Sequence, residues 1–278
     1  MLRITSEYFS EQEAKSPTRR SFAQNTGIQK NKKPGACKSF SVRFKESIAP
    51  IYEAMTSYSL RHNPNFDNYW HPLHSDADVF AVEEWERQQG TRVFLRDCLS
   101  CSIALDYNFT DNTSGIHTAI GQLEYEAKSN NDASAIGQLG RHLSAAIQSL
   151  PFYKNAPLVA AVPARPGKTS PDLPTALAKQ LAASLGLTDL TPHFQYYGPK
   201  AQLKELPLDE RWAAWEGARL SMSDAGAALL KDHSVILIDD KYQSGVSANF
   251  VAMILQQHGA AEIYGLYAVK TLRDKDNT

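Results

Sequence analysis

The sequence contains few cysteines, no long apolar run and almost no net charge. Three cysteines among 278 residues are an odd number, which argues against a disulfide-bonded scaffold and indicates a reducing compartment. No stretch approaches the roughly 20 apolar residues that a membrane-spanning helix needs. Residues 1–20 also lack the apolar core of a secretory signal. We therefore expect a cytoplasmic protein that makes no membrane contact.

The net charge of −1 conceals a basic N-terminal segment. Ten of the 29 Lys and Arg residues, but only four of the 30 Asp and Glu residues, lie in residues 1–48. Polar residues dominate up to position 45, so little fixed structure is expected before Phe40. Such an arm either contacts an acidic partner or is simply solvated. The pattern leaves a nucleic acid or a protein open as its partner.

The rest of the chain alternates apolar runs with amphipathic stretches. Short continuous apolar runs are typical of buried parallel strands, and leucines at four-residue steps indicate helices between them. Strands are expected at 91–95, 102–107, 158–162, 234–238 and 263–269, and helices at 41–60, 116–128, 133–149, 173–185 and 247–258, with a loop at 61–78. This order predicts an α/β fold with a twisted, mostly parallel sheet flanked by helices. We divide the chain into a basic arm with a helical extension, 1–75, and a main domain, 76–278.

A short loop after the strand at 234–238 has the composition of an anion site. Asp239 and Asp240 follow the strand, then Ser244, Gly245 and Ser247 precede a helix. Glycine lets the backbone approach an anion, the serines offer hydroxyls, and the free N–H groups of a helix start favour a phosphate. Two adjacent carboxylates suit sugar hydroxyls or a hydrated Mg²⁺.

This loop resembles the PRPP-binding signature of type I phosphoribosyltransferases. Three further segments are similar to the ComF-like branch of that family: a helix ending in Lys at 120–128, Ala161 to Arg165 as a pyrophosphate loop, and 202–211 as a mobile active-site loop. The resemblance implies a type I phosphoribosyltransferase-like fold with an N-terminal extension. It also implies a protein that binds PRPP or a related phosphoribosyl nucleotide with Mg²⁺ and transfers the phosphoribosyl group.

The resemblance assigns a role to each candidate site residue. Asp239 and Asp240 would face ribose hydroxyls or metal-bound water, and Lys200 and Arg211 would close over the reacting centre. The substrate-binding residues would be Pro163, Ala164, Arg165 and Lys168 at pyrophosphate, and Gln243, Ser244, Gly245, Val246 and Ser247 at the 5′-phosphate. No side chain is assigned as a direct metal ligand.

Three positions depart from the family pattern and support a second hypothesis. Lys241, Gln243 and Val246 replace residues usual in the loop, and the branched side chain of Val246 could narrow it. The alternative is a catalytically weak module that senses PRPP or a nucleotide. The resemblance would then imply a DNA-handling partner, in DNA uptake or anti-phage defence. A homo-oligomer is also possible.

Two further patterns suggest sites that need separate evidence. Cys98 and Cys101 have metal-ligand spacing, and His71 and His74 could complete a tetrahedral zinc site, but ordinary thiols and loop histidines are the preferred explanation. Gly167-Lys168-Thr169 is not a Walker A motif, because Val162 stands where that motif needs a glycine.

Overall fold

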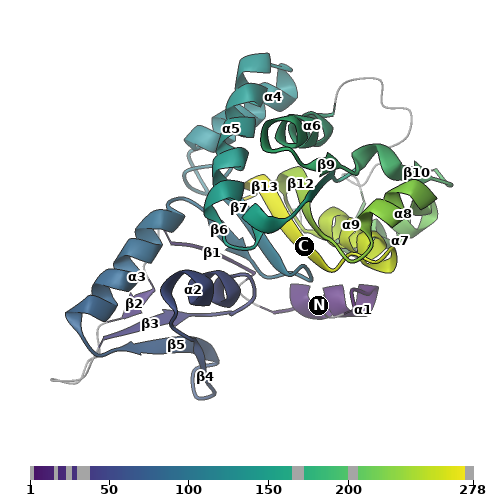
Figure 1. The fold of residues 1–278 in the computed structure, drawn as a ribbon. Helices are drawn as coiled ribbons and strands as arrows, with labels where there is room; N and C mark the ends of the chain where they lie inside the picture. Colours follow the sequence, from purple (N-terminus) through teal and green to yellow (C-terminus); the bar gives the residue numbers. More distant parts are fainter. Residues whose placement is uncertain are drawn as a thin grey trace.

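The main body of the protein is built on a seven-stranded sheet. The structure is a computed structural model that describes residues 3–15, 18–22, 27–29, 38–164, 172–199 and 206–272. The strand order is β1-β6-β7-β13-β12-β8-β9 (Figure 1). The bounds are β1 Arg19–Ser21, β6 Val93–Leu95, β7 Cys101–Tyr107, β8 Leu158–Ala161, β9 Thr188–Asp189, β12 Ser234–Tyr242 and β13 Glu262–Lys270. In this order, neighbouring strands from β7 to β9 are parallel. Strand β6 is antiparallel to β7, and β1 is antiparallel to β6.

Helices cover both faces of this sheet. On one face lie α4 (Ala119–Ser129), α5 (Ala133–Ser149) and α6 (Leu173–Leu185); on the other lie α1 (Ser6–Glu13), α7 (Leu208–Ala218), α8 (Asp224–Leu230) and α9 (Val246–Gln257) (Figure 1). Successive side chains of a strand point to opposite faces. In β12, Ile236 and Ile238 accordingly join the hydrophobic cluster of the first face, and Val235 and Leu237 that of the second. Burial on both faces explains the continuous apolar run in the sequence.

A second, smaller sheet stands beside the main one. It has the order β2-β3-β5-β4, with bounds β2 Ile28–Gln29, β3 Lys38–Val42, β4 Arg61–Asn63 and β5 Asn68–Leu73. Helices α2 (Ile48–Thr56) and α3 (Asp76–Gln89) pack on it (Figure 1). Their core is aromatic: the ring centroids of Tyr52 and Trp85 are 5.1 Å apart and perpendicular, and Phe40 stacks on Tyr52 at 4.7 Å.

Smaller elements connect the body. The 3₁₀ turns η1 (Tyr153–Asn155) and η2 (Thr191–His193) precede β8 and β10, respectively, and β10 (Phe194–Tyr196) pairs with β11 (Leu220–Met222). Within the part of the chain that the structure describes, no helix is long and apolar enough to cross a bilayer.

The structure confirms the α/β fold and corrects the N-terminal region. The large, mostly parallel sheet flanked by helices is the architecture that the sequence predicted, and helix 173–185 has its predicted bounds. The loop predicted at 61–78 was wrong, because β4 and β5 form a hairpin there. The helix predicted at 41–60 is limited to α2. The expectation of little structure before Phe40 was wrong for the described residues, since β1 pairs with β6 and α1 buries Phe9 against Trp212.

Candidate functional site

Two adjoining cavities open where the parallel strands end. The smaller, about 230 Å³, is lined by the loop from Gln243 to Ala248 and by Arg211. The larger, about 660 Å³, is lined by Asp240, by Pro163 and Ala164 after β8, and by the end of α4. Asp239 and Ser247 line both cavities, so a single ligand could occupy the two together. Ligand sites in open α/β sheets lie at this edge.

The smaller cavity is formed by a tight turn into α9. Gly245 has φ +81° and is the N-cap of that helix. A Cβ at this position would stand 2.2 Å from the Tyr242 hydroxyl, so only glycine fits. The helix then begins at Val246, and its first N–H groups have no partner within the helix. The turn therefore directs backbone donors and a positive dipole end at the cavity.

Side chains outside the loop hold this turn in place. The Lys270 ammonium is 2% exposed and donates to the carbonyl oxygens of Gln243 and Thr271, at 3.0 Å each. Asn249 donates from Nδ2 to the Gly245 carbonyl at 2.9 Å. These bonds hold the backbone carbonyls of the turn and of the end of β13, and so fix the conformation of the loop.

Arg211 and Ser247 add polar side chains to the smaller cavity. Arg211 is 8% exposed on α7 and donates from Nε to the Leu206 carbonyl at 2.9 Å. Trp215 donates from its indole N–H to Ser247 Oγ at 3.2 Å. Because Oγ accepts this bond, the hydroxyl proton of Ser247 remains available for an anionic ligand. Val246 is 2% exposed and belongs to the hydrophobic cluster below the loop.

The two carboxylates lie on β12 beyond the point where its pairing with β8 ends. That pairing stops at Ile238 opposite Ala161, whereas pairing with β13 continues to Tyr242 opposite Lys270. β12 is therefore longer than the predicted strand 234–238, and Asp239 and Asp240 stand on the strand itself. One edge of this extension is free of β8, which opens space for the larger cavity.

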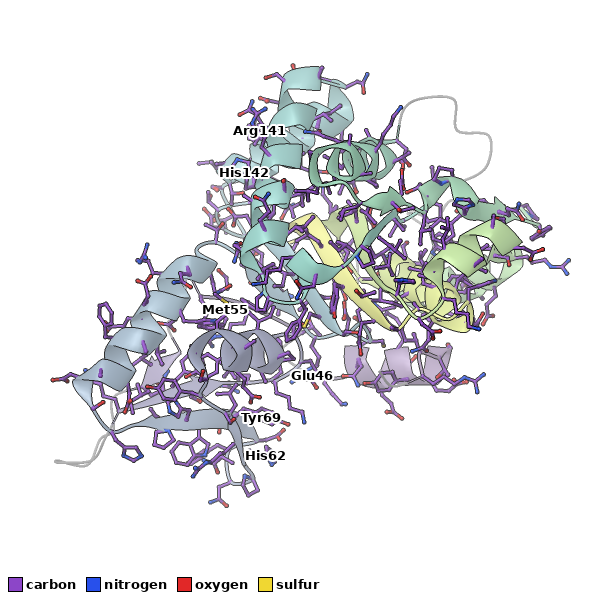
Figure 2. All side chains as sticks on the ribbon, viewed as in Figure 1. Glu46, Met55, His62, Tyr69, Arg141 and His142 are labelled. Carbon is purple, nitrogen blue, oxygen red and sulfur yellow. The ribbon has the colours of Figure 1, made fainter. Side chains whose placement is uncertain are left out.

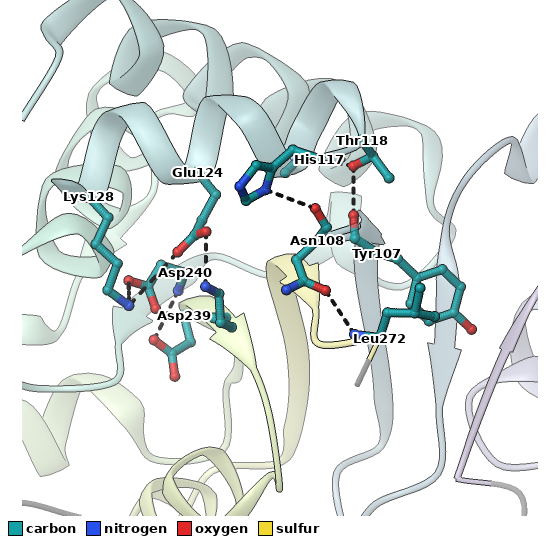
Figure 3. A network of polar contacts seen from close by, with 11 residues as sticks. Tyr107, Asn108, His117, Thr118, Glu124, Lys128, Asp239, Asp240 and Leu272 are labelled. Atoms are coloured by element: carbon teal, nitrogen blue, oxygen red, sulfur yellow. Dashed lines mark hydrogen bonds and ion pairs between the residues drawn. The ribbon is translucent and has the colours of Figure 1, made fainter. Parts of the chain in front are cut away.

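Two lysines neutralise the buried acids around this cavity. Lys128 Nζ lies 2.5 Å from Asp240 Oδ2 (Figure 3). Lys241 Nζ lies 3.1 Å from Glu124 Oε2. Glu124 and Lys128 are one helical turn apart on α4, with 3.9 Å between Glu124 Oε1 and Lys128 Nζ. The Glu124 side chain is 2% exposed and that of Asp240 is 9% exposed. Burial of these carboxylates requires such cations nearby.

The charges in this network shift three pKa values. Burial raises the pKa of Asp239, and the charge of Asp240 raises it further, against the opposing effect of Lys128. Burial also raises the pKa of Glu124, although Lys241 opposes this increase. For Lys128, burial lowers the pKa, but the combined attraction of Asp240, Glu124 and Asp239 outweighs burial and the net shift is upward. Lys128 is therefore a firmly charged cation beside the cavity, and Asp239 holds a proton more tightly than an exposed aspartate.

Contacts at the start of α4 determine the position of Lys128. Thr118 donates from its hydroxyl to the Tyr107 carbonyl at 2.6 Å, and His117 Nδ1 lies 3.1 Å from the Asn108 carbonyl oxygen (Figure 3). A Cβ on Gly121 would meet that same Asn108 oxygen at 2.1 Å, so a glycine is needed for this close approach. The contacts anchor the helix to the end of β7 and position Lys128 and Glu124 above β12.

The structure brings most of the predicted site residues to these two cavities. The loop residues 243–247, both aspartates, Pro163, Ala164 and Arg211 all line one cavity or both. Arg165, Lys168 and Lys200 lie outside the described residues. The roles assigned to all of them stay predictions.

The sequence analysis missed four residues that shape the site. Lys128, Glu124, Lys241 and Lys270 were not assigned to it. The spacing of Glu124 and Lys128, four apart on a predicted helix, was the one available signal, and it equally describes a solvated helix face. The role of Lys270 depends on the end of β13 lying beside the loop, which is a tertiary contact.

The zinc site considered from the cysteines and histidines is not formed. His71 Nδ1 lies 3.1 Å from the Tyr52 hydroxyl within the smaller sheet. Cys98 and Cys101 are buried around the β6–β7 turn, and burial raises the pKa of both thiols. Across the described residues, no three His, Cys, Asp or Glu side chains gather closely enough to hold a metal ion.

Comparisons with known proteins give remote structural similarities. No protein-family model and no curated protein matches the sequence. One similar solved structure is the glutamine phosphoribosylpyrophosphate (PRPP) amidotransferase from B. subtilis complexed with ADP and GMP, with 14% identity and a TM-score of 0.36 over 73% of this chain and 41% of that one. Another is described as the allosteric regulatory enzyme of purine biosynthesis, with 12% identity and a TM-score of 0.35 over 83% and 45%. This chain spans less than half the length of either protein, and its fold assignment rests on its own sheet topology.

Proposed function

We propose that this protein binds PRPP or a related phosphoribosyl nucleotide with Mg²⁺ and transfers the phosphoribosyl group. The observation that carries the proposal is the pair of adjoining cavities that share Asp239 and Ser247. One has the donors of a phosphate site and the other has carboxylates at its edge. A ribose 5-phosphate with a second anionic group would place its phosphate among these donors and its hydroxyls, or a bound Mg²⁺, beside these carboxylates.

The loop suits the 5′-phosphate of such a ligand. Ser244, Gly245 and Ser247 would receive it, with Val246 at the first position of the helix and Gln243 at the loop entrance. Arg211 would add a positive charge from α7. The ribose would then extend toward Asp239 and Asp240, and the pyrophosphate toward Pro163 and Ala164. Lys128 would face that pyrophosphate.

The residues present fit a hydrated Mg²⁺ ion. This ion is commonly held by one or two carboxylates together with substrate phosphates, and it keeps several waters. Asp239 and Asp240 supply two hard oxygen donors beside the larger cavity, and no fuller set of acidic or imidazole ligands exists among the described residues. When bound, the ion would screen the charge of the pyrophosphate leaving group. The protein's own part would be to hold both anionic ends and to orient the ribose between them.

A binding and turnover assay tests this function. PRPP affinity is measured by calorimetry with and without Mg²⁺, and pyrophosphate release is measured with a panel of purine and pyrimidine bases. Asp240→Asn and Ser247→Ala should each weaken binding or release about ten- to hundredfold, because each removes a charged or hydrogen-bonding contact. Asp224→Asn, an exposed aspartate on α8 outside both cavities, is the matched control. Absence of PRPP binding to the wild type would overturn the proposal.

The Lys128–Asp240 ion pair favours a second candidate, a catalytically weak PRPP or nucleotide sensor. A lysine that already neutralises the carboxylate competes with Mg²⁺ for it. PRPP binding without pyrophosphate release from any base would support this sensor.

The partner of such a sensor could be a DNA-handling protein or nucleic acid contacted by the basic arm. Because α1 and β1 are part of the fold, the arm is better tested by Lys30→Gln, Lys32→Gln and Lys33→Gln together than by truncation. Salt-sensitive nucleic-acid binding should weaken in this triple variant, and unchanged binding would exclude these lysines as the contact.

A further inference from the structure

Two aromatic residues outside the cavity linings connect the walls of the two cavities. Tyr196 is the last residue of β10, and Trp215 lies in the last turn of α7. Their ring centroids are 6.5 Å apart, and the ring planes are inclined by 23°. Side chains fill the space between β10, α7 and α9 (Figure 2). Because neither residue lines a cavity, both would act on a ligand through the residues that they hold.

Tyr196 holds the segment that follows β8. Its hydroxyl donates to the Pro163 carbonyl at 3.0 Å. Burial raises the pKa of Tyr196, and the charge of Asp172, which lines the larger cavity, raises it further, so the hydroxyl stays protonated and remains a donor. A second bond, from the Val162 N–H to the Ile238 carbonyl at 2.9 Å, joins the segment to β12. Tyr196 therefore fixes the wall of the larger cavity at Pro163.

Trp215 holds the start of α9. It is fully buried, and its indole N–H bond to Ser247 Oγ is accompanied by a stack on Phe250, with ring centroids 5.3 Å apart and planes inclined by 20°. Ser247 and Phe250 are three residues apart, so the two contacts lie about one turn apart on the helix. Trp215 therefore fixes the position of Ser247 in the wall of the smaller cavity and leaves its hydroxyl proton for a ligand.

The strand and the helix that carry the two rings are held against each other. The Tyr197 N–H donates to the Arg219 carbonyl at 3.3 Å, and the Gly198 N–H donates to the Ala218 carbonyl at 3.1 Å. A Cβ on Gly198 would stand 2.2 Å from the Gly217 carbonyl oxygen, so only a glycine permits this close approach. The end of β10 therefore cannot shift along the end of α7 without breaking these contacts.

A continuous set of contacts thus runs from Pro163 through the two rings to Ser247. We propose that Tyr196 and Trp215 are positioning residues that keep the walls of the two cavities at a fixed separation. This separation selects ribose phosphates with an anionic group at each end over those with a single phosphate. Binding of one group to a rigid pair of subsites brings the other group to its subsite at little entropic cost. The selectivity rests on the proposed function, whereas the connection between the walls does not.

Calorimetry with PRPP and with ribose 5-phosphate, at constant Mg²⁺ concentration, tests the selectivity. Tyr196→Phe keeps the ring and removes the hydroxyl, so it should weaken PRPP binding about five- to tenfold and ribose 5-phosphate binding by less than about twofold. The matched control is Tyr197→Phe, which removes an exposed hydroxyl that donates to Gln195 Oε1 at 2.7 Å and should change neither affinity. An equal loss of affinity for both ligands in Tyr196→Phe, or no loss for either, would overturn the selectivity.

Hydrogen exchange without any ligand tests the connection between the walls. Tyr196→Phe should speed amide exchange of Val162 about threefold or more and leave that of Asn249 unchanged, because the ring remains against Trp215. Tyr196→Leu also removes the ring, so exchange should rise at both amides. Tyr197→Leu is the control for this exposed strand end, and circular dichroism verifies that each variant is folded.

Either of two results would overturn the connection: unchanged exchange of Val162 in Tyr196→Phe, or unchanged exchange of Asn249 in Tyr196→Leu. Because no PRPP is present, a wild-type protein that binds no phosphoribosyl ligand would refute the proposed function and the selectivity, but not the connection between the walls.

Discussion

Buried carboxylates have different neighbours at the two ends of the main sheet. At the carboxyl end, Asp240 and Glu124 each lie beside a lysine, at 2.5 Å and 3.1 Å. At the amino end, Asp97 is equally buried, but the groups that stabilise its charge are neutral. The Leu99 N–H donates to Oδ1 at 3.0 Å, and the hydroxyls of Ser102 and Tyr242 partly oppose the rise of its pKa. The first arrangement pairs each buried carboxylate with a lysine of the chain itself, whereas the second leaves a buried carboxylate with neutral neighbours.

This difference separates buried carboxylates that are paired with lysines from one that has only neutral groups to stabilise its charge. Lys128 and Lys241 let the loop and the carboxylates hold their positions before a phosphoribosyl ligand arrives, which lowers the cost of binding. Asp97 instead adds an unfavourable term to folding at neutral pH, because burial raises its pKa to about 6. Gly245 lies in the loop at the carboxyl end and is also linked to the amino end, because Asn249 donates to its carbonyl and accepts the Cys98 N–H.

Gly245→Ala should have the largest effect, because it disturbs this turn. The added methyl group would clash with the Tyr242 hydroxyl at a φ of +81°, which ordinary residues rarely adopt. We expect a loss of about 2–4 kcal/mol in the free energy of unfolding, from backbone strain and overpacking. Urea denaturation measures this loss. Gly137→Ala, with only Arg141 Nη1 at 3.8 Å, should be neutral or slightly stabilising. An equal change in the free energy of unfolding for the two variants would refute the special role of the turn.

Asp97→Asn should stabilise the protein at neutral and alkaline pH. Because the pKa of Asp97 is raised to about 6 in the folded state, folding weakens as the pH rises from about 4 to about 6 and stays weakened above that range. Removing the charge should recover up to about 2–3 kcal/mol at pH 8 and nothing at pH 3.5. The amide oxygen of the substituted side chain would still accept the Leu99 N–H. Denaturation at both pH values provides the test, and a pH-independent difference would contradict it.

Lys128→Met should destabilise the opposite end by a smaller amount. Its removal leaves Asp240 next to Asp239 without a counter-ion, but the lysine side chain is 50% exposed, so solvent reduces the effect to about 1–2 kcal/mol. A double-mutant cycle with Asp240→Asn measures the interaction. The double variant should be more stable than the sum of the single effects indicates, and strict additivity would show that the pair contributes nothing.

Arg87→Ala should have the smallest effect, because its ion pair is exposed. Arg87 Nη2 lies 2.5 Å from Glu84 Oε1, with the arginine side chain 74% exposed. Water and salt screen such a pair, so we expect the melting temperature to change by less than about 1 °C. Differential scanning fluorimetry is sufficient to detect a larger change. A shift as large as that of Lys128→Met would remove the contrast between buried and surface charges.

Strands that form a continuous apolar run were predicted from the sequence, and polar strands were missed. The strands at 158–162, 234–238 and 263–269 were located because each is buried on both faces and reads as one apolar run. The hairpin of β4 and β5 was missed because Arg61, His62 and Asn63 are polar and take strand form only by pairing with β5. The early segments were missed for the same reason, since β1 is defined by its pairing with β6.

Sequence alone determined the α/β class, the order of its main elements and the loop from Asp239 to Ser247, because apolar periodicity and a glycine before a helix are local properties. Tertiary structure decided which charges meet. Lys128 on α4 and Lys270 on β13 are brought to the loop by packing between segments far apart in the chain, and the same packing brings Glu124 to Lys241. It also decided that Asp97 would be buried with neutral rather than cationic neighbours, since burial depends on the N-terminal layer of β2–β5, α2 and α3 and on α1 closing over the β6–β7 turn.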